Sequence, residues 1–134
     1  HDQGVRILSG SESGFALTPY GHWHAREMEV LVESMGLTPL EAIRCATHNG
    51  ATALRRDDGT IGVIAVGAAA DVLVVEGDPS RDVTVLSDRA NLRHVISRGR
   101  RVDLDRPWPQ RRPLPGEKVG RWAAEPLTWE VAQR

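Results

Sequence analysis

The pattern of apolar and polar residues predicts a helix from about His22 to Met35. Within this stretch apolar side chains recur at i, i+3, i+4 and i+7, the spacing of one buried helical stripe. Gly36 follows directly and suits the left-handed position that ends many helices. The predicted stripe consists of Met28, Leu31, Val32 and Met35. Three glutamates are expected to lie off this stripe: Glu27, Glu29 and Glu33.

A second helix is predicted immediately after the first. Residues 38–41, Thr-Pro-Leu-Glu, have the sequence of a capping box with proline at the first helical position. Asn49-Gly50 is expected to break this helix, and residues 51–54 to add a further turn. The buried face is expected to consist of Leu40, Ile43 and either Ala46 or Thr47.

From Gly59 onward the pattern becomes typical of short β-strands and turns. Asp71 is expected to fix a turn before its strand. No helix-length pattern intervenes, so we predict an α/β part over residues 1–57 and a small β part over residues 58–105. The expected β-type segments are Thr60–Val66, the strand Asp71–Val75, the short apolar run Val83–Leu86, and a hairpin from Leu92 to Val102 around Arg98-Gly99.

The opening segment combines a predicted strand with a small polar loop. Val5 to Ser9 reads as a short buried strand, and Glu12 follows where that strand should end. In α/β sheets and barrels, functional groups collect at strand ends. A carboxylate is also expected outside the buried strand, because an unpaired buried charge is costly. Glu12 is therefore a candidate functional residue, and a solvated loop glutamate is the alternative.

Composition limits the possible functions of this 134-residue chain. It is 40% hydrophobic and 26% charged with a formal net charge of −1, which is typical of a globular protein and gives no reason to expect nucleic acid or a membrane surface as a partner. The single cysteine, Cys45, allows no internal disulfide and is expected to be a small buried residue. A cytoplasmic location is expected. Because the chain begins with His1, secretion stays open.

The last segment, residues 106–134, differs from the rest. It holds five of the eight prolines, three of the four tryptophans, and six basic against three acidic residues. Proline favours an extended path, and tryptophan favours packing against another surface. We expect a Pro/Trp-rich tail, and its role stays open.

Several short motifs, taken in order, resemble the C-terminal part of the metal-dependent amidohydrolase superfamily, in its imidazolonepropionase-like and Xaa-Pro dipeptidase-like branch. Residues 4–14, GVRILSGSESG, are similar to the family's final barrel strand, G-V-x-I-x-x-G-T-D-x-G. Residues 24–29, HAREME, resemble the helix after it, and residues 35–47, MGLTPLEAIRCAT, are the most specific match. Residues 59–103 resemble the return into the family's small β-domain.

The resemblance implies the C-terminal end of a (β/α)8 barrel together with the C-terminal part of a small β-sandwich. It also implies a divalent metal, with Zn²⁺ expected, held mostly by histidines outside this chain. The metal makes hydroxide available, and an aspartate at the end of the last strand passes on the proton. The substrate class implied is an amide, cyclic amide or dipeptide. Completion by an N-terminal part, or a homo-oligomer, is expected.

The sequence departs from the family at the position of that aspartate, which carries Glu12. Glutamate can ligate a metal, but its extra methylene moves the carboxylate, and an error of about 1 Å can cost on the order of a hundredfold in rate. Glu12 is thus the predicted catalytic and metal-binding residue, and the isolated chain is expected to be inactive. The alternative is a non-catalytic relative with a decayed metal site that serves binding or assembly.

His22-Trp23-His24 has the form of an H-x-H metal pair but begins a helix, where residues i and i+2 point to different sides. We therefore expect His24 at the entry of the helix or at the rim of a pocket, where it can contact substrate. A structural role is expected for His48 and a surface position for His94. The serines near Glu12 lack the G-x-S-x-G context of a serine hydrolase.

Overall fold

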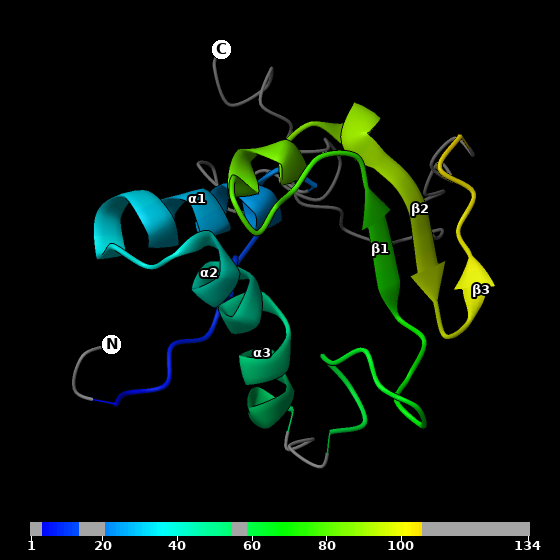
Figure 1. Cartoon of the computed structure of the whole chain (residues 1–134), viewed down its shortest axis with the longest axis horizontal. Helices are drawn as coiled ribbons and strands as arrows, with labels where there is room; N and C mark the ends of the chain where they lie inside the picture. The colour runs from blue at the N-terminus through cyan, green and yellow to red at the C-terminus, as the bar shows by residue number, and fades with distance from the viewer. Residues whose placement is uncertain (1–3, 14–20, 55–58, 106–134) are drawn as a thin grey trace, which may run out of the picture.

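The computed structural model of the chain describes residues 4–13, 21–54 and 59–105. Three helices lie on one side of the molecule and a small antiparallel sheet on the other, and the segment around residues 83–91 crosses between them (Figure 1). The described part is therefore mixed α/β. The predicted tail, residues 106–134, lies outside the described residues.

The first predicted helix is confirmed as α1, Trp23–Met35. Leu31 is buried, and Met28 and Val32 pack against the same core. Met35 is 52% exposed, so the fourth member of the expected stripe is wrong. Gly36 has a φ of 70°, and its N–H donates to the Val32 carbonyl at 3.2 Å, which confirms the left-handed helix end. Met35 is the last residue of α1.

The capping box of α2, Pro39–Ala46, is confirmed in both directions. The Glu41 N–H donates to Thr38 Oγ1 at 3.3 Å, and the Thr38 N–H donates to Glu41 Oε2 at 2.8 Å. The predicted buried face is wrong at Leu40, which is 62% exposed, and at Ala46 and Thr47, which are exposed. Only Ile43 of that set packs against the core. The residues that α2 buries are the small Ala42 and Cys45, because α1 packs closely against this helix.

The break between the second and third helices falls at Thr47 rather than at Asn49-Gly50. Thr47 has φ −120° and ψ −90°, and α3, His48–Ala53, begins directly after it. The Thr47 hydroxyl donates to the Ile43 carbonyl at 2.8 Å, which satisfies an acceptor at the end of α2. Asn49 uses its side chain for a tertiary hydrogen bond instead of a turn, so the Asn-Gly pair stays helical.

The sheet consists of β1, Val72–Val75, β2, Leu92–Ser97, and β3, Arg100–Arg101, in the order β1-β2-β3. β1 and β2 are antiparallel with Leu73 opposite Val95. The predicted hairpin is confirmed, with φ of 49° at Arg98 and 75° at Gly99. The Arg98 N–H donates to Asp71 Oδ1 at 2.7 Å, so Asp71 holds the turn at the far end of the sheet.

The expected strand over residues 5–9 and two of the expected β-type segments do not form strands. Residues 60–66 are bends and turns, residues 83–86 form the 3-10 helix η1, Val83–Leu86, and residues 5–9 have no regular secondary structure. Glycines at positive φ turn the first of these segments, and the Asp82 carboxylate caps η1 by accepting the Thr84 N–H at 2.9 Å. A second 3-10 helix, η2, spans Arg89–Asn91.

The buried core joins the helices to η1. Its members are Leu31, Leu37, Ala42, Cys45 and Val83. Val83 lies beyond the predicted division near residue 57 yet belongs to the same core as side chains of α1 and α2. The segment that carries it lies next to α1 (Figure 1). None of the helices in the described ranges is long and apolar enough to cross a membrane.

Candidate functional site

The predicted catalytic residue, Glu12, lies exposed on the loop that follows residues 5–9. Its backbone φ is 44°, in the left-handed region that non-glycine residues seldom adopt. Among the described residues, the other non-glycine at positive φ is Arg98, whose tight hairpin turn requires it. Such backbone strain costs about 1–3 kcal/mol and gathers at functional sites. This outlier favours a functional role for the Glu12 loop.

Groups from all three helices form hydrogen bonds with residues 7–10, which lead into Glu12. Residues 7–13 are called the Glu12 loop below. The Glu27 carboxylate of α1 accepts the Ser9 hydroxyl at 2.8 Å and the Gly10 N–H at 2.9 Å. The Ser9 N–H donates to the Cys45 carbonyl at 3.2 Å, and Asn49 Nδ2 of α3 donates to the Ile7 carbonyl at 2.9 Å. The backbone of this run is therefore bonded to helices in place of a neighbouring strand.

Two residues that anchor the loop, Glu27 and Asn49, were not predicted to do so. Glu27 was expected off the apolar stripe, and Asn49 was expected to break a helix. The signal for Glu27 is its spacing, because it lies four residues before the buried Leu31 and so on the same side of α1. Asn49 carries no such signal, because the helix break at Thr47 separates it from the buried Cys45.

Glu29 is also expected off the stripe, and it is nevertheless buried, with only 7% of its surface exposed. Its carboxylate pairs with Arg26 and accepts a hydrogen bond from the Ser87 hydroxyl. η1 and Ser87 cover a second face of α1, which a single-stripe pattern does not reveal. The hydrogen bond from Arg26 to Glu29, with the charge of Glu33, raises the pKa of Arg26 above its ordinary value.

The histidines of the described residues do not gather at one place. His22 precedes α1 and His24 lies in its first turn, both exposed, so the substrate contact assigned to His24 stays a prediction. His48 begins α3 and is half-buried. His94 is exposed on β2, as predicted. Within residues 4–13, 21–54 and 59–105, no three His, Cys, Asp or Glu side chains gather closely enough to hold a metal ion.

Cys45 is a buried structural residue, as predicted. It is 3% exposed, and its sulfur lies 3.9 Å from Asn49 Nδ2. Burial raises the pKa of the Cys45 thiol, so the thiolate needed for nucleophilic chemistry is disfavoured.

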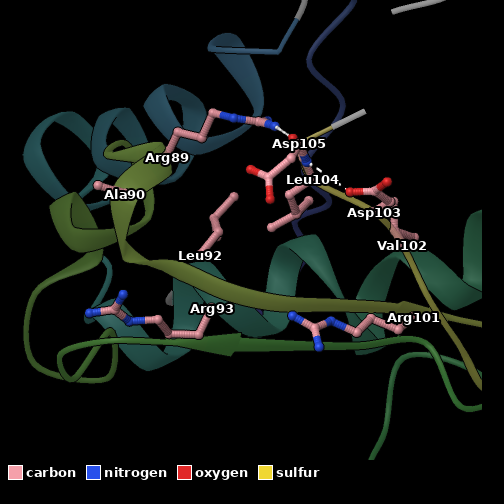
Figure 2. A pocket seen from close by; sticks show the side chains of 9 residues that line it. All are labelled: Arg89, Ala90, Leu92, Arg93, Arg101, Val102, Asp103, Leu104 and Asp105. Atoms are coloured by element: carbon pink, nitrogen blue, oxygen red, sulfur yellow. Dashed lines mark hydrogen bonds between the residues drawn. The ribbon is translucent and has the colours of Figure 1, made fainter. Parts of the chain in front are cut away.

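A cavity of about 690 Å³ opens beside β2, β3 and η2 (Figure 2). Arg89 reaches across its upper rim to the Leu104 carbonyl, and Arg93 and Arg101 line its lower side. Neither Glu12 nor His24 lines this cavity. Arg93 is also paired with Glu76, so part of this positive charge is already neutralised.

Comparison with known proteins gives one family. The family described as "Amidohydrolase family" matches residues 1–102. Ochratoxinase from Aspergillus niger is 33% identical over 97 residues, which are 72% of this chain and 19% of that protein. Imidazolonepropionase from Cutibacterium acnes is 41% identical over 86 residues, 60% of this chain and 20% of that protein. The chain therefore spans about a fifth of the length of these curated relatives.

A solved structure points to the same family. The crystal structure of a Xaa-Pro dipeptidase with bound methionine in the active site is similar with a TM-score of 0.66 at 32% identity, over 76% of this chain and 23% of that one. The resemblance stated from the motifs is confirmed. With its motifs, fold and relatives in agreement, the chain belongs to the amidohydrolase family.

Proposed function

We propose that this chain is the closing segment of a metal-dependent amidohydrolase that hydrolyses a carbon–nitrogen bond in an amide, cyclic amide or dipeptide. The observation that carries the proposal is Glu12. It lies in a strained, anchored loop within the part of the chain that matches the family. The full-length protein that contains this segment is called the complete enzyme below.

In the proposed architecture, residues 1–57 supply the last strand and terminal helices of a (β/α)8 barrel, and residues 58–105 supply part of a small β-sandwich. Supporting this, residues 4–9 bond to helices although their sequence is that of a strand. A neighbouring barrel strand would pair with the side of this run that the helices leave open. The proposal therefore expects residues 5–9 to become a strand in the complete enzyme.

Glu12 has the chemistry needed for proton transfer during hydrolysis. Its carboxylate accepts the proton that the attacking water loses as the new carbon–oxygen bond forms. It then returns that proton to the nitrogen as the carbon–nitrogen bond breaks, so that the amine leaves neutral and Glu12 ends the cycle as a carboxylate. The left-handed backbone at Glu12 offers one way to offset the extra length of glutamate relative to the family's aspartate.

The described residues can supply one ligand of a metal site, but they do not make up a complete site. Glu12 offers carboxylate oxygens, the donor type that divalent cations such as Zn²⁺ accept beside histidine nitrogens. The remaining ligands would come from parts of the complete enzyme outside this chain. When bound, the cation would supply Lewis acidity and favour ionisation of water near neutral pH.

Metal removal tests this function. Dialysis of the complete enzyme against a chelator is expected to abolish hydrolysis of dipeptide or cyclic amide substrates, and Zn²⁺ at one or two equivalents is expected to restore it. The measurement is amine release together with metal content by mass spectrometry. Mock dialysis without chelator is the control. Full turnover by metal-free protein would contradict the proposal.

The second candidate function is a non-catalytic binding or assembly protein, and the glutamate in place of the family's aspartate is the observation that favours it. The same measurement separates the two candidates. A complete protein purified without stoichiometric divalent metal, and not activated by adding it, would support the non-catalytic candidate.

The isolated 134-residue chain is expected to be inactive and to bind a hydrophobic dye. Its large apolar side chains at the surface would meet the rest of the barrel and sandwich in the complete enzyme. Strong dye fluorescence from the chain and little from the complete enzyme is the expected result. A sharp cooperative melt of a dye-free monomer would count against the segment interpretation. The exposed side chains include Val5, Leu54, Ile64, Val66 and Leu73.

A further inference from the structure

Both carboxylate oxygens of Glu27 accept hydrogen bonds from the Glu12 loop, one from each of two consecutive residues. Oε2 accepts the Ser9 hydroxyl at 2.8 Å, and Oε1 accepts the Gly10 N–H at 2.9 Å. Hydrogen bonds to an ionised carboxylate are stronger than those between neutral groups, and two of them fix direction as well as distance. Glu27 lies in the second turn of α1, half-buried, and this helix packs against the core through Leu31. The loop is thereby attached to a rigid element.

The point of attachment lies two residues before Glu12. The φ of 44° at Glu12 persists only where neighbouring structure over-determines the backbone. Asn49 and the Cys45 carbonyl hold residues 7 and 9, and Glu27 extends this anchorage to residue 10. On the other side of Glu12, the Ser13 hydroxyl donates to Ser11 Oγ at 2.9 Å.

We propose that Glu27 is a positioning residue, which sets the place of the Glu12 carboxylate by fixing Ser9 and Gly10. The proposal rests on the function proposed above for Glu12. Glu27 acts through the loop and does not contact the reacting atoms. Its carboxylate contributes geometry rather than a proton, so an uncharged group of the same shape should replace it.

The test compares three variants of the complete enzyme. Glu27→Ala removes both acceptors, and a loop shift of about 1 Å is expected to lower kcat about a hundredfold with KM nearly unchanged. Glu27→Gln keeps the carbonyl acceptor for Gly10 and can donate to the Ser9 oxygen, so kcat is expected within about threefold of the wild type. Glu33→Ala, an exposed glutamate on the same helix, is the matched control and is expected to leave kcat unchanged.

Two results would overturn the proposal. A kcat for Glu27→Ala within twofold of the wild type would show that the loop does not need this anchor. A Glu27→Gln variant as slow as Glu27→Ala would show that the charge matters rather than the geometry. If Glu27→Ala does not fold, Ser9→Ala removes one of the two hydrogen bonds. It is expected to lower kcat about tenfold, and an unchanged kcat would overturn the proposal equally.

Amide hydrogen exchange in residues 4–13, resolved at Gly10, gives a readout that does not depend on activity. Glu27→Ala is expected to speed exchange at Gly10 at least about tenfold, while Glu33→Ala leaves it unchanged. If the wild-type complete enzyme hydrolyses no amide, the function proposed for Glu12 fails. Faster exchange then still supports the anchoring by Glu27, and unchanged exchange overturns it.

Discussion

Replacing Glu12 by glutamine is expected to lower kcat of the complete enzyme by about 10²- to 10⁴-fold, the range that a positioned general acid–base contributes. Glutamine has nearly the same shape but cannot take up the proton of the attacking water. The glutamine amide is also a poorer metal ligand than a carboxylate. The measurement is steady-state hydrolysis with metal content determined on the same samples, so that loss of metal and loss of proton transfer are told apart.

Two further variants make the Glu12 experiment specific. Glu12→Asp keeps the carboxylate but withdraws it by one methylene, and a misplacement of about 1 Å is expected to cost on the order of a hundredfold. Glu33→Gln makes the same charge change at an exposed position of α1 and is expected to leave kcat unchanged. Unchanged turnover in Glu12→Gln would remove Glu12 from the mechanism and favour the non-catalytic candidate.

The second large effect is expected at Gly62, where the segment after residue 59 crosses the junction of α2 and α3. A Cβ at Gly62 would lie 2.6 Å from the Thr47 carbonyl oxygen and 2.8 Å from its carbon, and φ is +71°. Both atoms belong to the backbone, so neither can move away cheaply. Gly62→Ala is expected to lower the free energy of unfolding by about 2–5 kcal/mol. Two costs add up here: alanine in a left-handed backbone conformation, and the overpacking of its Cβ against the Thr47 backbone.

Gly67 offers a matched control for this prediction. Its φ is +89°, and a Cβ there would meet nothing within 4 Å. Gly67→Ala is therefore expected to cost only the left-handed conformation, about 1–2 kcal/mol. Urea denaturation of the complete enzyme measures both variants. Equal shifts in the two midpoints would show that the segment does not pack against Thr47 as the structure has it.

The candidate site was only partly predictable from the sequence. Its place after an apolar run and its resemblance to a family motif indicate Glu12 as a functional residue, and its left-handed backbone supports this prediction. The anchoring role of Glu27 could not be read in the same way. A glutamate beside an apolar stripe is ordinarily solvated, and only the return of residues 9 and 10 across α1 supplies its two donors.

The sequence by itself determined the features that depend on neighbours within a few residues. The Thr38–Glu41 capping box and the Gly36 helix end form as predicted, because each satisfies its own backbone groups locally. The Arg98-Gly99 turn also forms as predicted, although its N–H groups are bonded to the distant Asp71 and Ala70. Tertiary structure decided what depends on distant partners. Residues 5–9 and 60–66 have strand-like sequences, but a strand exists only where another strand pairs with it.

Which side chains are buried was likewise decided by packing between elements. Leu40 is exposed while the smaller Ala42 is fully buried, because Ala42 lies on the side of α2 that faces α1 and Leu40 does not. Glu29 is buried because Arg26 and Ser87 meet its carboxylate there. Helical periodicity gives the direction of each side chain, and only the assembled fold shows what lies in that direction.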